Sequence, residues 1–157
     1  MTRAYLGIGS NLGDRLANLQ GAVDGIATAD GVRVVAVSPV YETAPVGGPE
    51  QDDFLNAVVA IDTELTPRQL MALGQALEAA AHRVKRERWG PRTLDVDVLL
   101  VGNVEIHEPD LEVPHPRMTE RAFVVAPLAD LDPDWAAFIP ADQTCERRPG
   151  LVLTVPE

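Results

Sequence analysis

The run RWGPRTLDVDVLL, residues 88–100, supplies the last strand in an order of elements that defines the fold. Its second half is rich in valine and leucine, as a buried strand is. Alternate side chains of a strand share one face, so Asp95 and Asp97 project together, about 7 Å apart along the strand, and the apolar residues between them face the other way. A strand that looks buried therefore carries two carboxylates on one face.

A helix is expected upstream of this strand. The sequence TPRQ, residues 66–69, is typical of a capping box with proline at the first helical position. Leu70, Leu73 and Leu77 then continue one apolar face at helical spacing. We therefore expect a helix that begins after Thr66 and leads through a basic loop to the strand.

The first half of the chain supplies the remaining elements. AYLGI, residues 4–8, is an apolar strand followed by leucines at helical spacing, with Gly31 as the end of the helix. Residues 32–40 and 54–62 are two further strands, separated by the long loop 41–53. The order β-α-β-β-α-β predicts an α+β protein with a ferredoxin-like core and an antiparallel sheet.

Extra elements follow the core. A ribbon is expected around Glu105 and Val113, then a helix from Thr119 and a tail interrupted by prolines. The chain has 157 residues, 46% of them hydrophobic, and it contains no repeat or linker. This length suits one hydrophobic core, so we expect a single domain over 1–157.

The charges are unevenly distributed. The 13 basic and 24 acidic residues give a net charge of -11, which argues against nucleic acid or an anionic membrane as a partner. Yet five of the basic residues fall between positions 83 and 92: Arg83, Lys85, Arg86, Arg88 and Arg92. A local positive patch on an acidic protein indicates a small anionic ligand.

The cysteine content and hydropathy bear on the compartment. Cys145 is the single cysteine, so no internal disulfide can form. No apolar run has the length of a signal peptide or of a membrane span. We therefore expect a cytoplasmic protein.

The two aspartates need partners, because a polar pair on an apolar strand costs desolvation energy. The candidate partners are arginine or a divalent cation, and for hard oxygen ligands the natural cation is Mg²⁺, which is held by one or two carboxylates together with substrate phosphates. The adjacent cationic loop could neutralise those phosphates. The alternative interpretation is an edge strand with a solvated acidic face, next to a solvated basic loop.

Other kinds of site are less well supported. Gly7, Gly9 and Gly13 miss the spacing of a dinucleotide-binding motif, and we expect them to shape a tight turn between strand and helix. No phosphate-binding P-loop motif is present. His107 and His115 have no partners at zinc-ligand spacing, and Cys145 has no activating motif around it.

Five motifs together resemble the 6-hydroxymethyl-7,8-dihydropterin pyrophosphokinase family. They are GSNLG at the start, YETAPVG, FLNA, RWGPRTLDVDVL and VPHPRMTERAF, and the likeness extends to about Leu128. The resemblance implies a ferredoxin-like enzyme of folate biosynthesis that transfers diphosphate from ATP to the hydroxymethyl group of a reduced pterin and releases AMP.

The resemblance also implies how ATP is bound. Asp95 and Asp97 would hold two Mg²⁺ ions, and Arg83 and Arg92 would stabilise the transferring diphosphate. The further nucleotide contacts would be Lys85 or Arg86, Arg88, Trp89, His115, Arg117 and Arg121, with Met71, Gln75, Glu78 and Val98 framing the nucleotide.

The pterin site follows from the same resemblance. The pterin ring would lie between Phe123 and either Trp89 or Phe54. Its polar edge would be read by Asn56 and by groups near Thr43, Ala44 and Val46. ATP and the pterin would be the only partners, and a monomer is expected.

Two other functions share part of this pattern. A nucleotidyltransferase also pairs Gly-Ser with two aspartates on a strand, but here Gly9-Ser10 lies far upstream of Asp95. A non-catalytic ferredoxin-like module that binds a nucleotide or metabolite would leave the carboxylates and arginines without a shared purpose. For the pyrophosphokinase we expect no dedicated general base, because the transition state is loose and needs alignment and charge neutralisation.

Overall fold

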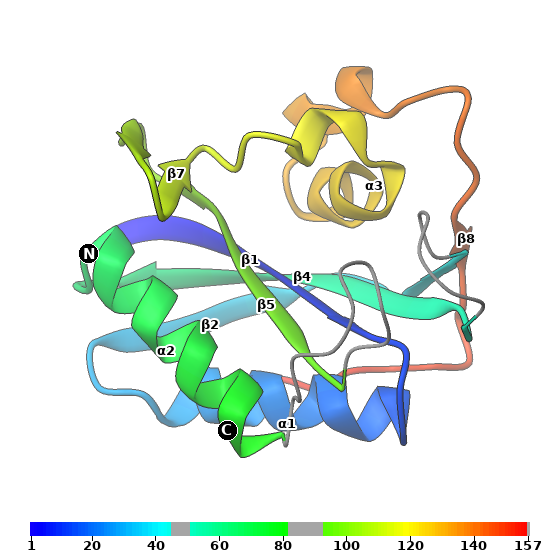
Figure 1. Ribbon diagram of the computed structural model, residues 1–157, viewed down its shortest axis with the longest axis horizontal. Helices are drawn as coiled ribbons and strands as arrows, with labels where there is room; N and C mark the ends of the chain where they lie inside the picture. The colour runs from blue at the N-terminus through cyan, green and yellow to red at the C-terminus, as the bar shows by residue number, and fades with distance from the viewer. Residues whose placement is uncertain (45–50, 82–92, 157) are drawn as a thin grey trace.

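The computed structural model describes residues 1–44, 51–81 and 93–156. Figure 1 shows a central sheet with helices on both sides. Two short 3-10 helices, η1 (Met118–Glu120) and η2 (Pro133–Phe138), flank the third α-helix. The other elements are β1 (Thr2–Ser10), α1 (Arg15–Thr28), β2 (Val32–Val37), β3 (Tyr41–Thr43), β4 (Phe54–Thr63), α2 (Pro67–Ala80), β5 (Asp95–Val101), β6 (Ile106–Glu108), β7 (Leu111–Val113), α3 (Ala122–Leu131) and β8 (Glu146–Arg147).

The main sheet has the predicted topology. Its order runs β5-β1-β4-β3-β8, and β2 also pairs with β4. Every pairing is antiparallel, which is the α+β, ferredoxin-like arrangement expected from the sequence. The strands β6 and β7 form the separate ribbon that was expected near residues 105–113. The predicted fold class is therefore confirmed.

The two helices of the core begin where the sequence predicts. Asp14 caps α1, and its carboxylate accepts a hydrogen bond from the Ala17 N–H at 3.1 Å. At α2 the Thr66 hydroxyl accepts from the Gln69 N–H at 3.2 Å, and the Gln69 side chain accepts from the Thr66 N–H at 2.8 Å. This reciprocal pair is the predicted capping box.

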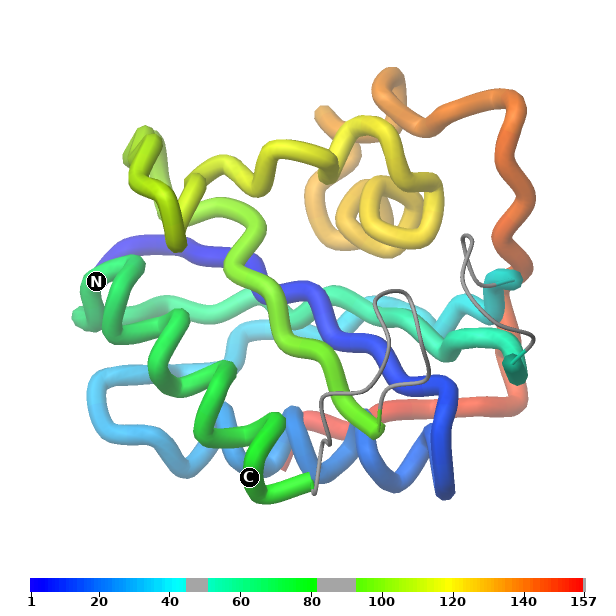
Figure 2. Tube along the Cα trace, viewed as in Figure 1, coloured from blue at the N-terminus to red at the C-terminus, as the bar shows by residue number. Residues whose placement is uncertain are grey.

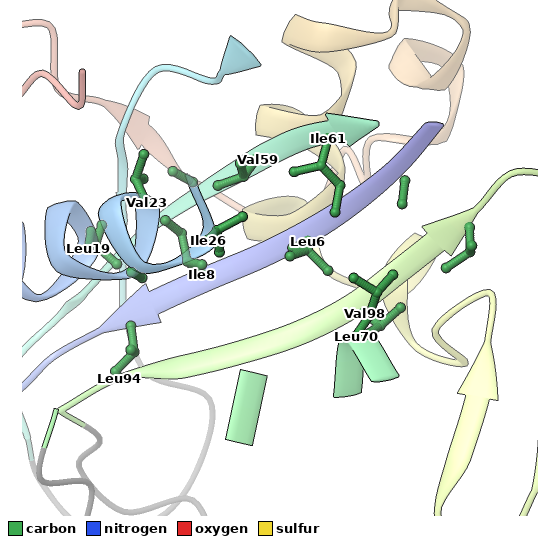
Figure 3. Packing of buried hydrophobic residues seen from close by; sticks show 14 of the residues in the cluster. Leu6, Ile8, Leu19, Val23, Ile26, Val59, Ile61, Leu70, Leu94 and Val98 are labelled. Carbon is green, nitrogen blue, oxygen red and sulfur yellow. The ribbon is translucent and has the colours of Figure 1, made fainter. Parts of the chain in front are cut away.

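The sheet is covered differently on its two faces. Helices α1 and α2 pack on one face, and α3 packs on the other (Figure 1). Figure 3 shows the main core, in which Leu19, Val23 and Ile26 of α1 and Leu70 of α2 meet the strands. The face toward α3 has a smaller core, made by Val58, Leu99, Met118, Val124 and Leu128.

The strand expected over residues 32–40 ends earlier than predicted, at Val37. Ser38 and Pro39 interrupt it, and the Ser38 hydroxyl accepts a hydrogen bond from the Val58 N–H at 2.9 Å. The chain then forms β3, so the first three residues of the predicted loop 41–53 are a strand. Proline cannot donate to a ladder, which explains the break.

The helix predicted from Thr119 also begins later. Residues 118–120 form the 3-10 turn η1, and α3 starts at Ala122. The tail carries an unexpected strand, β8, which pairs with β3. In Figure 2 the tail descends along the edge of the sheet and returns beside α1, where the Gln20 side chain bonds both backbone groups of Thr154.

Glu42 joins three parts of the chain, and this gives a pH-dependent prediction. Its carboxylate pairs with Arg15 of α1 and with Arg148 of the tail, and these two cations hold the pKa of Glu42 below its ordinary value of 4.5. A lowered pKa in the folded state stabilises the fold above the ordinary value. That contribution is lost as the pH falls from 4.5 through the folded-state pKa.

We therefore expect Glu42→Gln to lower the free energy of unfolding by about 1 kcal/mol at pH 7, because the ion pairs are partly exposed. The difference from the wild type should shrink below pH 4.5, as urea unfolding at a series of pH values would show. The matched control is Glu64→Gln, at an exposed carboxylate. A difference that stays constant down to pH 3 would contradict this assignment.

Candidate active site

The centre of the site is a row of residues that crosses three strands. Gly9 of β1 is the registered partner of Asp95 in β5 and of Asn56 in β4. Opposed residues of antiparallel strands point to the same face, so Asp95 and Asn56 stand on one face with glycine between them. A Cβ atom at position 9 would lie only 2.8 Å from the Oδ1 atom of Asn56. A side chain at Gly9 would therefore displace the Asn56 amide.

The position of Gly7 and Gly9 corrects the sequence interpretation. Both glycines lie inside β1 and do not shape the turn before α1. Gly13, with a φ of 76°, occupies that turn. A glycine in a strand interior often marks a close approach of other groups, and this holds for Gly9.

The two aspartates share the face that α3 covers. Asp97 is registered with Gly7, and Gly7 is registered with Val58, which packs against α3. Asp97 is exposed and Asp95 is half-buried. Leu94, Val96 and Val98 belong to the core on the opposite face, as strand alternation predicts. The carboxylates thus stand on the face away from α1 and α2.

The donor set can be tested against a metal ion. Within 1–44, 51–81 and 93–156 there is no group of three or more histidine, cysteine or acidic side chains that could form a complete metal site. Mg²⁺ needs no such group, because it keeps several waters and takes one or two carboxylates and substrate phosphates. The hard oxygens of Asp95 and Asp97 fit Mg²⁺ on this basis.

His115 brings a cationic cluster to Asp97. The His115 N–H donates to the carbonyl of Leu99 at 3.0 Å, which fixes the residue beside β5. Burial lowers the pKa of His115; the Asp97 carboxylate opposes this shift, and the charges of Arg121 and Arg117 act with burial. The four side chains are therefore close enough to interact electrostatically.

A pocket of about 620 Å³ opens beside this cluster. Its polar walls carry Arg117 and Arg121, and the Arg121 guanidinium lies 5.6 Å from the centre of the Phe123 ring. An arginine over a flat ring gives a surface that suits an aromatic, anionic ligand. The remaining lining residues are Thr43, Ala44, Glu120, Ala122, Gln143 and Thr144.

Asn56 is held near the β3 side of the pocket. Its side chain is buried, and its Nδ2 donates to the Thr43 hydroxyl at 3.0 Å. Phe54 precedes it on the same face of β4, because it is two residues away. The Asn56 amide is thus oriented by its bond to Thr43, and its Oδ1 atom occupies the space over Gly9.

A family model named 7,8-dihydro-6-hydroxymethylpterin-pyrophosphokinase matches residues 5–133 of this chain. The chain belongs to this pyrophosphokinase family. A 2-amino-4-hydroxy-6-hydroxymethyldihydropteridine pyrophosphokinase of Methylorubrum extorquens is 53% identical over 134 residues, which are 85% of each chain. The protein of the same name from Pseudomonas aeruginosa is 47% identical and covers 84% of this chain and 82% of its own.

Solved structures share the fold of this pyrophosphokinase family member. A Plasmodium falciparum HPPK-DHPS chain gives a TM-score of 0.65 with 14% identity, over 82% of this chain. A second HPPK-DHPS structure also gives 0.65, with 12% identity over 83%. This chain spans only 38% and 40% of those longer chains. At such low identity the likeness concerns the fold alone.

The expected nucleotide contacts of the pyrophosphokinase fall into two groups. His115, Arg117 and Arg121 gather near Asp97, as described above. Met71, Gln75 and Glu78 lie on α2, and the Glu78 carboxylate accepts a hydrogen bond from the Val96 N–H at 3.0 Å. These two groups flank β5, which is the outer strand of the sheet on this side.

Val98 is placed differently from the other nucleotide residues. Its side chain is 8% exposed and packs in the core with α1 and α2. The Val96 N–H points to α2, away from β1, and strand alternation turns the Val98 backbone to the same edge. Any contact of Val98 with a nucleotide is therefore made by its backbone.

Four of the expected pterin residues are brought together. Thr43, Ala44 and Phe123 line one pocket, and Asn56 bonds Thr43. The remaining expected residues of the pterin and nucleotide sites lie outside the described part of the chain. They are Val46, Arg83, Lys85, Arg86, Arg88, Trp89 and Arg92.

Sequence reasoning missed part of this site. Gln143 and Thr144 of the tail line the pocket, although no motif marks them and they lie beyond the residues that match the family. Gly9 was noticed but was assigned to a turn. The reason for this glycine is its register with Asn56, which no local pattern marks.

Proposed function

We propose that this chain transfers the terminal diphosphate of ATP to 6-hydroxymethyl-7,8-dihydropterin, with release of AMP, as a step of folate biosynthesis. The observation that carries the proposal is the shared face of the sheet. Asp95 and Asp97 stand there, and His115 interacts electrostatically with Asp97 and with Arg117 and Arg121, the two arginines of a pocket that is also lined by Phe123 and Thr43. Its relatives at 45–53% identity are named as pyrophosphokinases of this pterin.

The chemistry needs two ligands held in line. The hydroxymethyl oxygen forms a bond to the β phosphorus of ATP, and the bond from that phosphorus to the oxygen shared with the α phosphate breaks. The hydroxyl proton passes to solvent, since a loose transition state needs no strong base. Holding both reactants in one geometry supplies much of the rate enhancement.

The chain's own residues would hold the phosphates and the pterin. Asp95 and Asp97 would hold two Mg²⁺ ions, which neutralise phosphate charge when they are bound. Arg117 and Arg121 would add positive charge beside the phosphates. Phe123 would stack on the pterin ring, and the Asn56 amide would read its polar edge.

The basic segment would complete the nucleotide site under the same proposal. Arg83 and Arg92 would stabilise the transferring diphosphate, because their positive charge compensates the negative charge on the phosphate oxygens and that which develops on the bridging oxygen as its bond to the β phosphorus breaks. Either Lys85 or Arg86, together with Arg88 and Trp89, would contact the nucleotide. These roles rest on the motif RWGPR and its distance from Asp95 in the sequence.

We also propose a cytoplasmic monomer with ATP and the pterin as its small-molecule partners. The lone cysteine suits a reducing compartment. Over the part of the chain that the structure describes, no helix is long and apolar enough to cross a membrane. Light scattering coupled to gel filtration should give the mass of one chain, and the mass of a dimer would contradict the proposed state.

Identification of the products tests the proposed reaction. The protein is incubated with ATP, Mg²⁺ and the pterin, and phosphorus NMR should show AMP and pterin diphosphate appearing at equal rates. ADP would indicate an ordinary kinase, and free pyrophosphate would indicate a nucleotidyltransferase. Formation of ADP, formation of free pyrophosphate, or binding without turnover would each overturn the proposal.

A further inference from the structure

The tail segment 143–148 begins at the pocket, where its first two residues belong to the lining. Other parts of the lining come from the end of β3, at Thr43 and Ala44, and from the start of α3. Among the described residues, Gln143 and Thr144 add the contribution of the tail to this lining. This segment lies beyond residues 5–133, so nothing in the family match assigns it a role.

Gln143 holds the start of α3 from outside the helix. Its Oε1 accepts a hydrogen bond from the Ala122 N–H at 2.9 Å, and its Nε2 donates to the Glu120 carbonyl at 2.6 Å. The first N–H groups of a helix have no partner within it. Arg121, the N-cap residue, makes no side-chain capping bond, so Gln143 takes over this task.

The rest of the segment is fixed to β3 and to the far end of α3. Arg147 donates to the Tyr41 hydroxyl at 3.2 Å and to the Asp130 carboxylate at 2.7 Å. Arg148 donates through its backbone N–H to the carbonyl of Val40, the residue before β3, at 2.8 Å and through its side chain to Glu42 of β3 at 2.9 Å. The segment thus ties both ends of α3 to one strand.

This arrangement connects the two sides of the pocket. Thr43 and Ala44 belong to the β3 side, and Arg121 and Phe123 belong to the α3 side. The two sides are far apart in the sequence, and segment 143–148 bonds both of them. A change at Gln143 would release only the start of α3, because the anchors at Arg147 and Arg148 remain.

We propose that Gln143 is a positioning residue for pterin binding, which sets the place of Phe123 by capping α3 from the tail. The inference rests on the proposed function, because it takes this pocket as the pterin site. Gln143 acts through the helix and not by contact with the reacting atoms. Its loss should therefore weaken pterin binding more than it slows the chemical step.

The experiment compares two glutamines that each bridge backbone groups. Gln143→Ala removes the bridge at α3, and Gln20→Ala removes the bridge from α1 to Thr154 at the other end of the tail. Pterin affinity is measured by fluorescence titration in the presence of Mg²⁺ and a non-hydrolysable ATP analogue. The values of KM and kcat and the melting temperature are measured on the same preparations.

Gln143→Ala should raise the pterin Kd about 5- to 10-fold, equivalent to about 1 to 1.4 kcal/mol for the lost hydrogen bonds, with kcat within twofold of the wild type. Gln20→Ala should leave the pterin Kd unchanged. It should lower the melting temperature about as much as Gln143→Ala does. If Gln143→Ala does not fold, Gln143→Glu keeps the acceptor for the Ala122 N–H and should give a smaller rise in Kd.

Three results would overturn the inference. The first is a pterin Kd of the folded Gln143 variant that stays within twofold of the wild type. The second is a rise in pterin Kd for Gln20→Ala as large as that for Gln143→Ala. In both cases the proposed function still stands if the wild type forms pterin diphosphate. A wild type that neither binds the pterin nor forms product would overturn both the function and this inference.

Discussion

Asp97→Ala should lower kcat about 10³-fold at saturating ATP and pterin, which is the size of effect that loss of preorganised charge stabilisation produces. Asp97 is exposed on the outer strand, so its removal creates no buried cavity. The melting temperature should stay within about 2 °C of the wild type. A steady-state assay of AMP release over a range of Mg²⁺ concentrations measures the loss.

The matched control is Asp62→Ala, which removes a strand aspartate from the sheet far from the pocket. Asp62 lies near the end of β4, and its carboxylate pairs with Arg3 and Arg33. This variant should keep near-normal turnover. Near-normal turnover of Asp97→Ala at limiting Mg²⁺ would show that the aspartates of β5 do not bind the Mg²⁺ ions.

Gly9→Ala should weaken pterin binding about 10- to 100-fold while the protein still folds. The new methyl group would lie 2.8 Å from Asn56 Oδ1, so the Asn56 side chain must move and lose its bond to Thr43. An oriented amide that loses one or two hydrogen bonds to a ligand accounts for a loss of this size. Titration with the pterin measures the affinity, and circular dichroism checks the fold.

Gly7→Ala is the control for this variant. Gly7 lies two residues earlier in the same strand and on the same face, but a Cβ atom there would meet only the Leu99 side chain at 3.5 Å. That distance is an ordinary contact, so pterin affinity should change less than threefold. Equal losses in both variants, or unchanged affinity in Gly9→Ala, would refute the role given to Gly9.

The order of elements could be read from the sequence because local signals were strong. The capping box at Thr66 and the alternation in β5 each depend on short segments, and the structure confirms both. The break after Val37 was harder to foresee. It depends on the Ser38 hydroxyl accepting the Val58 N–H, a contact between distant parts of the chain.

The candidate site could be predicted only where motifs carry it. Asp95 and Asp97 share a face because they are two residues apart, and this follows from any strand. The tail could not be foreseen in the same way. Gln143 reaches α3 from 21 residues beyond Ala122, and no periodicity relates the two positions.

Gly9 shows an intermediate case. Its place in β1 follows from the apolar residues around it, but its reason for being glycine is Asn56, which lies on another strand. Strand register had to be known before that contact could be inferred. The mistake of assigning Gly9 to a turn came from reading the glycines of GIGSNLGD together, although only Gly13 has a positive φ among them.

A crystal structure with Mg²⁺, the pterin and an ATP analogue that carries a methylene group between the α and β phosphates tests the central claim most directly. The β and γ phosphates should lie against Asp95 and Asp97, and the pterin ring should lie on Phe123 with its polar edge at Asn56. Phosphates bound away from β5, or a pterin outside the pocket between β3 and α3, would contradict the account.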